Sequence, residues 1–310
     1  MITEFFHEPV MLKEVLDWLL VGRHGVYVDG TVGGGGHAEA ILKNTDALLV
    51  GIDWDDEALA FAEKRLRKFG SRKILIKENF VNLKTILERL KIEKVDGVLL
   101  DLGVSSHQLD AAERGFSFSQ QAPLDMRMNR GLKVSAYDIV NGFAQQELEK
   151  IIRGYGEEKM AARIARAISR QRQIAPIRTT TELADVVKAC LPLKKNRKIH
   201  PATKTFQALR IAVNGELDNI TPAVHAAVES LNVGGRLCVI SFHSLEDRLV
   251  KTAFRHLAET CVCPKDIPVC VCQKKALVEI LTKKPLTPTA AEIQKNPRAR
   301  SARLRVVGRI

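Results

Sequence analysis

Short apolar runs rich in β-branched residues alternate with amphipathic stretches along the first hundred residues of the chain. These runs predict strands at residues 25–30, 47–53, 73–77 and 95–102. Apolar residues at helical spacing predict the intervening helices at residues 38–43, 57–69 and 83–90. Strands and helices in this order form a doubly wound, mostly parallel sheet with right-handed crossovers, so we expect an α/β fold.

The alternation stops at about residue 110, and the pattern up to residue 204 is helical and basic. It then resumes with two helices and two strands, which we predict at residues 205–217, 222–231, 236–242 and 303–310. The simplest organisation is a helical domain, residues 110–204, inserted into one α/β domain made of residues 1–109 and 205–310.

A glycine-rich loop joins the first predicted strand to the first predicted helix, where residues 29–37 read Asp-Gly-Thr-Val-Gly-Gly-Gly-Gly-His. Four consecutive glycines let a ligand approach the main-chain N–H groups and the positive end of the helix. Asp53, at the end of the second predicted strand, is placed to accept hydrogen bonds from both hydroxyls of a ribose. The pattern predicts a nucleotide-type cofactor, although a bare surface loop has the same composition. Because Gly33, Gly35 and Ala38 also satisfy the dinucleotide pattern, NAD and S-adenosylmethionine both remain open.

Composition and charge narrow the choice of class and partner. The 310 residues are 45% apolar and 27% charged, as in globular proteins, and no apolar run approaches the roughly 18 residues that cross a bilayer. The N-terminus lacks the features of a signal peptide, so we expect a cytoplasmic protein with no membrane partner. Much of the net charge of +12 lies in residues 157–200, where eleven Lys and Arg accompany four acids. Arg163, Arg166 and Arg170 share a helical face there, which favours a nucleic-acid backbone as partner, although a solvated helix face has the same pattern.

Polar side chains follow the fourth predicted strand in Asp-Leu-Gly-Val-Ser-Ser-His-Gln-Leu-Asp, residues 101–110. Four further motifs follow in order: Arg-Gly-Phe-Ser-Phe, Pro-Leu-Asp-Met-Arg-Met, Ser-Phe-His-Ser-Leu-Glu-Asp and Asn-Pro-Arg-Ala-Arg-Ser, at residues 114–118, 123–128, 241–247 and 296–301. In these motifs and the glycine loop, and nearly end to end, the chain resembles the MraW (RsmH) family of bacterial methyltransferases. Members of that family use S-adenosylmethionine to methylate N4 of a decoding-centre cytosine in the 16S rRNA of the small ribosomal subunit.

The resemblance implies a class I S-adenosylmethionine-dependent methyltransferase fold, an inserted helical domain that binds RNA, and 16S rRNA rather than DNA as the partner. It also implies the cofactor-binding residues, which are Gly35, Gly36, His37, Asp53, Phe80, Asp101 and Gln108. Of these, Asp53 is expected to hold the ribose and Phe80 to lie against the adenine. From the residues alone, Phe80 also fits a core position, Asp101 a helix cap and His37 a cap-region residue. The assignment of Gln108 rests wholly on the resemblance.

The implied chemistry predicts a set of catalytic residues. The lone pair of the cytosine amine is delocalised into the ring, so the enzyme must position the amine and accept its hydrogen bonds. We expect Asp101, with Ser105 and Ser106, to supply the acceptors. His243 is either a further catalytic wall of the pocket or a structural histidine. Two other functions stay open, namely an NAD-dependent oxidoreductase and a non-catalytic RNA-binding protein on a methyltransferase fold.

The six cysteines bear on the chemistry in two ways. Methylation at cytosine C5 would need a cysteine nucleophile, and Cys190 and Cys238 are both predicted to be buried. The other four form two Cys-x-Cys pairs, and they are Cys261, Cys263, Cys270 and Cys272. Such pairs can supply a tetrahedral thiolate site for zinc, or they can be small apolar loop residues. We expect no metal in the catalytic site.

Overall fold

The computed structural model describes residues 9–105, 108–109, 111–192, 200–261, 263 and 272–310. The chain divides into two compact units, of which unit 1 is Met1–Gly103 with Leu217–Ile310 and unit 2 is Val104–Glu216. Contacts place helix α10 (Thr203–Asn214) in unit 2, whereas the predicted boundary at residues 204/205 assigned most of it to the α/β domain. The functional limits of the two domains stay a prediction.

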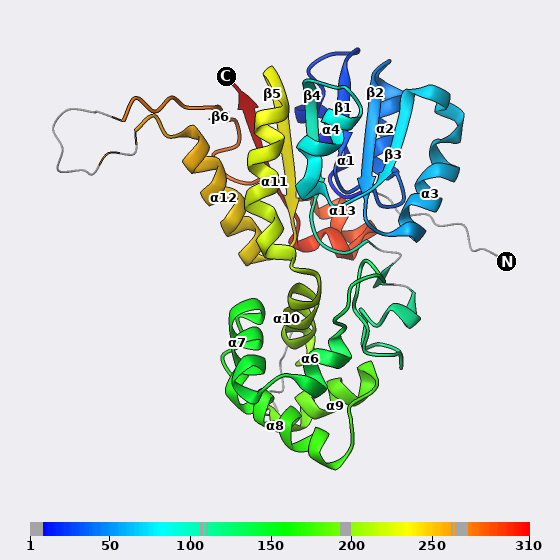
Figure 1. The fold of residues 1–310 in the computed structure, drawn as a ribbon, viewed down its shortest axis with the longest axis vertical. Helices are drawn as coiled ribbons and strands as arrows, with labels where there is room; N and C mark the ends of the chain where they lie inside the picture. Colours follow the sequence, from blue (N-terminus) through cyan, green and yellow to red (C-terminus); the bar gives the residue numbers. More distant parts are fainter. Residues whose placement is uncertain (1–8, 106–107, 110, 193–199, 262, 264–271) are drawn as a thin grey trace. The chain divides into compact units, whose positions relative to one another are not determined.

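Unit 1 is built on one seven-stranded sheet with the strand order β3-β2-β1-β4-β5-β7-β6 (Figure 1). Its strands are β1 (Val26–Asp29), β2 (Leu48–Asp53), β3 (Lys73–Lys77), β4 (Val95–Asp101), β5 (Leu231–Ser241), β6 (Val278–Ile280) and β7 (Arg303–Arg309). Strands β1 to β5 pair in parallel, and β7 pairs antiparallel with both β5 and β6. The order reverses between β1 and β4, and open α/β sheets bind ligands at such a switch point. The predicted doubly wound, mostly parallel sheet is confirmed.

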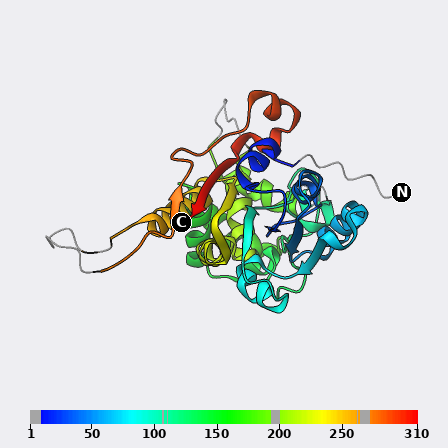
Figure 2. The same cartoon turned by 90° about the horizontal axis from the view of Figure 1, so that it is seen from above.

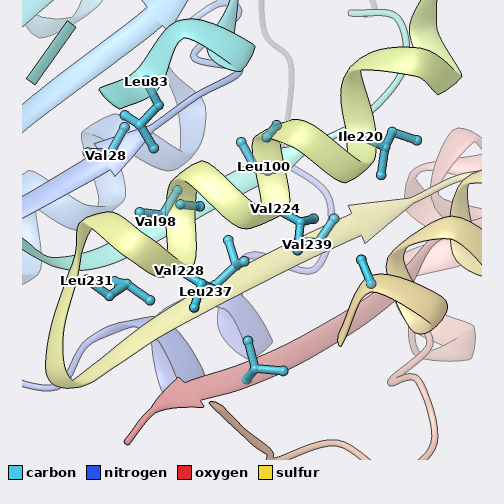
Figure 3. Close-up of a cluster of buried hydrophobic side chains, with 14 of the residues drawn as sticks. Val28, Leu83, Val98, Leu100, Ile220, Val224, Val228, Leu231, Leu237 and Val239 are labelled. Carbon is cyan, nitrogen blue, oxygen red and sulfur yellow. The ribbon is translucent and has the colours of Figure 1, made fainter. Parts of the chain in front are cut away.

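Helices cover both faces of this sheet, as the view from above also shows (Figure 2). They are α1 (Leu12–Leu19), α2 (Gly36–Asn44), α3 (Asp56–Leu66), α4 (Leu83–Arg89), α11 (Glu216–Ser230), α12 (Ser244–Ala258) and α13 (Ala290–Lys295), with 3-10 turns at Arg67–Arg72, Phe80–Asn82 and Pro297–Ser301. Successive strand residues point to opposite faces, so α4, α11 and α12 pack on one side and α1, α2 and α3 on the other. Figure 3 shows Val224 and Val228 of α11 lying over Leu237 and Val239 of β5.

Unit 2 is helical. It contains the short 3-10 turn Ala112–Arg114 and the helices α6 (Ala136–Gly142), α7 (Gln145–Gly156), α8 (Ala161–Ile174), α9 (Thr180–Cys190) and α10. Capping boxes start two of the helices, through Ser135 with Asp138 and Thr179 with Glu182. None of the helices in the described part of the chain is long and apolar enough to cross a membrane.

The predicted charge pattern of α8 holds in the structure. Apolar residues at positions 161, 164, 165 and 168 are buried, and Arg163, Arg166 and Arg170 on the opposite side are exposed. Arg172, by contrast, donates to the carbonyl oxygen of Val140 at 2.8 Å and so has a structural contact.

Two of the sequence motifs fold against each other inside unit 2. Arg114 is 2% exposed, and its guanidinium donates to the carbonyl oxygens of Arg127 and Met128 at 3.1 and 2.8 Å. Phe116 is buried, and Phe118 stacks on His200 with ring centroids 4.5 Å apart. These contacts explain the two motifs at residues 114–118 and 123–128 as packing within the unit.

Candidate active site

The glycine loop crosses the carboxyl ends of three strands in unit 1. Backbone N–H groups tie it down, from Gly30 to the carbonyl oxygen of Leu99 in β4 and from Val32 to that of Ile52 in β2, each at 2.9 Å. A Cβ on Gly30 would lie 2.6 Å from a methyl of Leu100, so a side chain does not fit there. Gly33 and Gly35 have φ angles of 49° and 79°, a region that glycine adopts without strain. The loop leads directly into α2, and Gly35 caps that helix without a side chain.

Asp53 joins the loop to the end of β2. One carboxylate oxygen accepts the N–H of Gly33 at 2.9 Å, and the other accepts the N–H of Asp55 at 3.0 Å. Burial raises the pKa of Asp53 to about 6, against the lowering effect of these N–H bonds. Each carboxylate oxygen can accept a second hydrogen bond, so the side chain fits both a structural contact and a ribose.

Two more acids lie at the switch point between β1 and β4. Burial raises the pKa of Asp29 to about 7, and the charge of Asp53 adds to the effect. Burial also raises the pKa of Asp101 well above its usual range, helped by the charges of Asp29 and Glu246. One oxygen of Asp29 and one of Asp101 are buried without a hydrogen-bond partner among the described residues. Unsatisfied buried carboxylate oxygens at the end of a parallel sheet indicate a ligand site.

His37 is a neighbour of this acid cluster. Its Nε2 lies 2.9 Å from the carbonyl oxygen of Val10 and, since that oxygen can only accept, donates to it. Its Nδ1 lies 3.8 Å from a carboxylate oxygen of Asp101, and the side chain is 7% exposed. The imidazole therefore holds the N-terminal segment against α2 and lies beside Asp101.

Phe80 starts the short helical turn Phe80–Asn82 after β3, where the side chain of Asn79 accepts the N–H of Val81. It is partly buried and packs against the core on the α4 side of the sheet. A Cβ on Gly30 would lie 3.3 Å from the Cβ of Phe80, which places this residue beside the glycine loop. Core packing and adenine contact are thus compatible at this position.

His243 has a structural function at the start of α12. Its Nδ1 accepts the N–H of Glu246 at 3.3 Å, and the Glu246 carboxylate accepts the N–H groups of Phe242 and His243 at 2.7 and 3.2 Å. This reciprocal capping holds Glu246, which is 1% exposed, close enough to Asp101 at the end of β4 for its charge to raise the pKa of Asp101. Sequence reasoning missed Glu246 and Asp29, although the spacing of His243 and Glu246 is the signal of a capping box.

The remaining predicted residues belong to unit 2. The N–H of Ser105 donates to the side chain of Gln108 at 3.0 Å, and the N–H of Gln108 donates to the hydroxyl of Ser105 at 3.2 Å. Gln108 is 4% exposed. Ser106 lies outside the described residues. The structure thus brings the predicted residues of unit 1 together at one edge of the sheet and pairs Ser105 with Gln108 separately.

The sequence of the chain is similar to sequences of known proteins. Residues 4–310 match the MraW methylase family. The chain belongs to that family. The ribosomal RNA small subunit methyltransferase H of Syntrophus aciditrophicus is 54% identical over 308 residues, which cover 98% of each chain. That of Clostridioides difficile is 50% identical over 311 residues, covering 99% of this chain and all of the relative.

Membership of the family decides between the two cofactors. The chain is a methyltransferase that uses S-adenosylmethionine on a class I fold, and the NAD-dependent oxidoreductase is set aside. The residues of unit 1 fit this cofactor, because residues 33–36 of the loop have no side chains to exclude it and the buried acids favour a cationic ligand. Asp53 can hold the ribose, and Gly35, Gly36, His37, Phe80 and Asp101 lie around the same loop.

The two isolated cysteines do not offer a nucleophile. Cys238 is fully buried in β5, and burial raises the pKa of its thiol strongly. Cys190, expected to be buried, is only partly so in α9, and burial raises its pKa as well. Because the thiolate is the reactive form, these positions do not support methylation at carbon.

Proposed function

We propose that the chain methylates N4 of a decoding-centre cytosine in the 16S rRNA of the small ribosomal subunit. The observation that carries the proposal is the cluster of Asp29, Asp53 and Asp101 beside the glycine loop, together with membership of the MraW methylase family. The two full-length relatives named above are small subunit rRNA methyltransferases. We also propose that the protein acts in the bacterial cytoplasm, where that RNA is made.

Some residues of unit 1 bind the cofactor, and others orient the target amine. When bound, S-adenosylmethionine supplies a methyl group on a positively charged sulfur. Asp53 holds the ribose, and Phe80 lies against the adenine. Asp101, in its ionised form, accepts a hydrogen bond from the target amine and so turns its lone pair toward the methyl group. A cation beside Asp101 opposes the effect of burial and favours this ionised form.

The roles of the other predicted residues follow from their contacts. His37 is fixed by its hydrogen bond to the carbonyl oxygen of Val10 and lies beside Asp101, so we assign it to positioning. His243 orients Glu246 by capping α12, and we assign it to positioning as well. Ser105 and Gln108 hold each other in one conformation at the start of unit 2, and their proposed roles toward base and cofactor rest on the resemblance. Ser106 remains a candidate acceptor on the resemblance alone.

Unit 2 binds the RNA backbone through the exposed face of α8. Arg163, Arg166 and Arg170 offer three guanidinium groups on one side of a helix, and their counterion release favours a polyanion of any sequence. Changing all three to Gln should weaken RNA binding. The plot of log affinity against log salt concentration should become less steep, its negative slope decreasing in magnitude by about 2–3. Lys13, Arg23 and Lys64 of unit 1 are exposed, so the same change at these positions is a control of equal charge.

The deciding experiment transfers labelled methyl from S-adenosylmethionine to small subunits that lack the modification, followed by nucleoside analysis. We expect N4-methylcytosine at a single position. A label on another base or atom would overturn the proposed target. Cofactor and RNA binding without any transfer would instead indicate a non-catalytic RNA-binding protein.

A further inference from the structure

Three cysteines meet between α12 and β6, in a part of unit 1 that the methyl-transfer chemistry does not use. The Sγ atoms of Cys261, Cys263 and Cys272 all lie within 4.8 Å of one another. Those of Cys261 and Cys272 are 3.9 Å apart, and the N–H of Cys263 donates to the sulfur of Cys261 at 3.4 Å. Ten residues separate Cys261 from Cys272 in the sequence, so the fold and not the chain spacing brings these two sulfurs together.

The distance between the sulfurs distinguishes a metal site from a disulfide. Zinc holds thiolates at about 2.3 Å in a tetrahedron, which places two sulfurs about 3.8 Å apart. A disulfide would require about 2.05 Å. The observed 3.9 Å excludes a disulfide, and it matches both a hydrogen bond between two thiols and the sulfur spacing of a tetrahedral zinc site.

Hydrogen bonds between the end of α12 and the residues just before β6 hold the two segments that carry the cysteines. Lys274 donates to the carbonyl oxygen of His256 at 2.7 Å and to the carboxylate of Glu259 at 3.3 Å. The N–H of Leu277 donates to the carbonyl oxygen of Leu257 at 2.8 Å. The segments leave α12 and return to β6 side by side, as Figures 1 and 2 show. Little rearrangement is then needed for the thiols to bind an ion.

We propose that Cys261, Cys263 and Cys272 bind one zinc ion, which ties the segment after α12 to the segment before β6. On binding, the three thiols release their protons to water and form three zinc–sulfur bonds, and one further donor completes the tetrahedron. The proposed role of the ion is to stabilise this part of the fold by joining the two segments. Cys270 lies outside the described residues, and the proposal does not depend on it.

The test uses the full chain without an affinity tag, purified under reducing conditions. Elemental analysis should find about one zinc per chain. Cys261→Ser and Cys272→Ser should each lose the zinc, and Cys190→Ser in α9 of unit 2 should retain it. Replacement by Co²⁺ should produce the visible absorption of a tetrahedral thiolate complex in the wild type and not in Cys261→Ser. Fluorescence of Trp18 and Trp54, both in unit 1, will show that the variants are folded.

A second measurement treats the wild-type protein with a chelator. Loss of zinc should speed proteolytic cleavage between α12 and β6 while the fluorescence stays unchanged. The proposal is overturned if reduced wild-type protein dialysed after incubation with zinc holds none, if Cys261→Ser and Cys272→Ser keep their zinc, or if Cys261 and Cys272 form a disulfide. Unchanged cleavage after full removal of zinc would refute the stabilising function.

Discussion

Asp29 allows a quantitative test of the acid cluster, because its carboxyl group is buried and one of its oxygens has no hydrogen-bond partner among the described residues. Burial raises its pKa from 3.8 to about 7. The folded chain keeps the proton up to about pH 7, whereas the unfolded chain loses it near pH 3.8. Between these values the folded state binds more protons, so the free energy of unfolding falls as the pH rises.

The magnitude follows from the two pKa values. Relative to the protonated side chain, Asp29 lowers the free energy of unfolding by about 2 kcal/mol at pH 5 and by about 4 kcal/mol at pH 8. Asp29→Asn removes this dependence. Its amide also puts a donor where no acceptor is described, at a cost of about 1–3 kcal/mol that does not vary with pH. We therefore expect the stability of the variant relative to wild type to rise by roughly 2–3 kcal/mol from pH 5 to pH 8.

The assay is urea unfolding of the cofactor-free protein at pH 5, 6, 7 and 8. Tryptophan fluorescence follows unit 1 specifically, because Trp18 and Trp54 both lie in it. Asp46→Asn is the matched control, since Asp46 is exposed and its contact with Arg23 is a weak surface pair at 3.8 Å. A difference between Asp29→Asn and wild type that stays constant over this pH range would refute the reasoning.

Three further predictions concern cofactor binding, stability and thiol reactivity. Asp56 is exposed, so Asp56→Ala is the control for the first and Asp56→Asn for the second. Asp53→Ala should weaken S-adenosylmethionine binding by about 1–3 kcal/mol, or about 5- to 150-fold, by calorimetry; unchanged affinity would mean that Asp53 does not hold the ribose. Asp247→Asn should lower the free energy of unfolding by about 3 kcal/mol, because the buried Arg305 guanidinium, 2.7 Å from the Asp247 carboxylate, loses its charged partner. A loss no larger than that of Asp56→Asn in urea unfolding would contradict this. Cys238 should resist alkylation in the folded protein at pH 8, and Cys238→Ala should retain methyl transfer; labelling of Cys238 in mass spectrometry would show that its thiol is accessible.

The pattern of apolar residues along the chain predicts the strands that are buried on both faces of the sheet. The four strands up to residue 101 are found close to their predicted ranges, because a buried parallel strand needs an apolar, β-branched run of its own. Strand β5 begins at Leu231, not at residue 236, because Leu231 pairs with Val95 ahead of an irregularity in the register. Strand β6 has only three residues and was not predicted, since it exists through its pairing with β7.

The candidate site likewise has features that the sequence predicts and features that depend on the folded structure. Its loop and Asp53 follow from the sequence, because glycines in a strand–loop–helix pattern have one dominant use. The electrostatics do not, since the pKa of Asp101 depends on Asp29 from β1 and Glu246 from α12. His37 and His243 each have a structural contact that their residue type does not indicate, with the carbonyl oxygen of Val10 and the N–H of Glu246.

Residue order is enough to predict the doubly wound sheet, the place of the cofactor loop, the basic face of α8 and, through six motifs, the family. These depend on periodicity and short-range spacing, which a chain carries in its residue order. Only the folded chain shows which acids share one buried cluster and which cysteine sulfurs lie within 4.8 Å of one another. Burial and charge coupling arise between residues far apart in the sequence, so they exist only once the chain has folded.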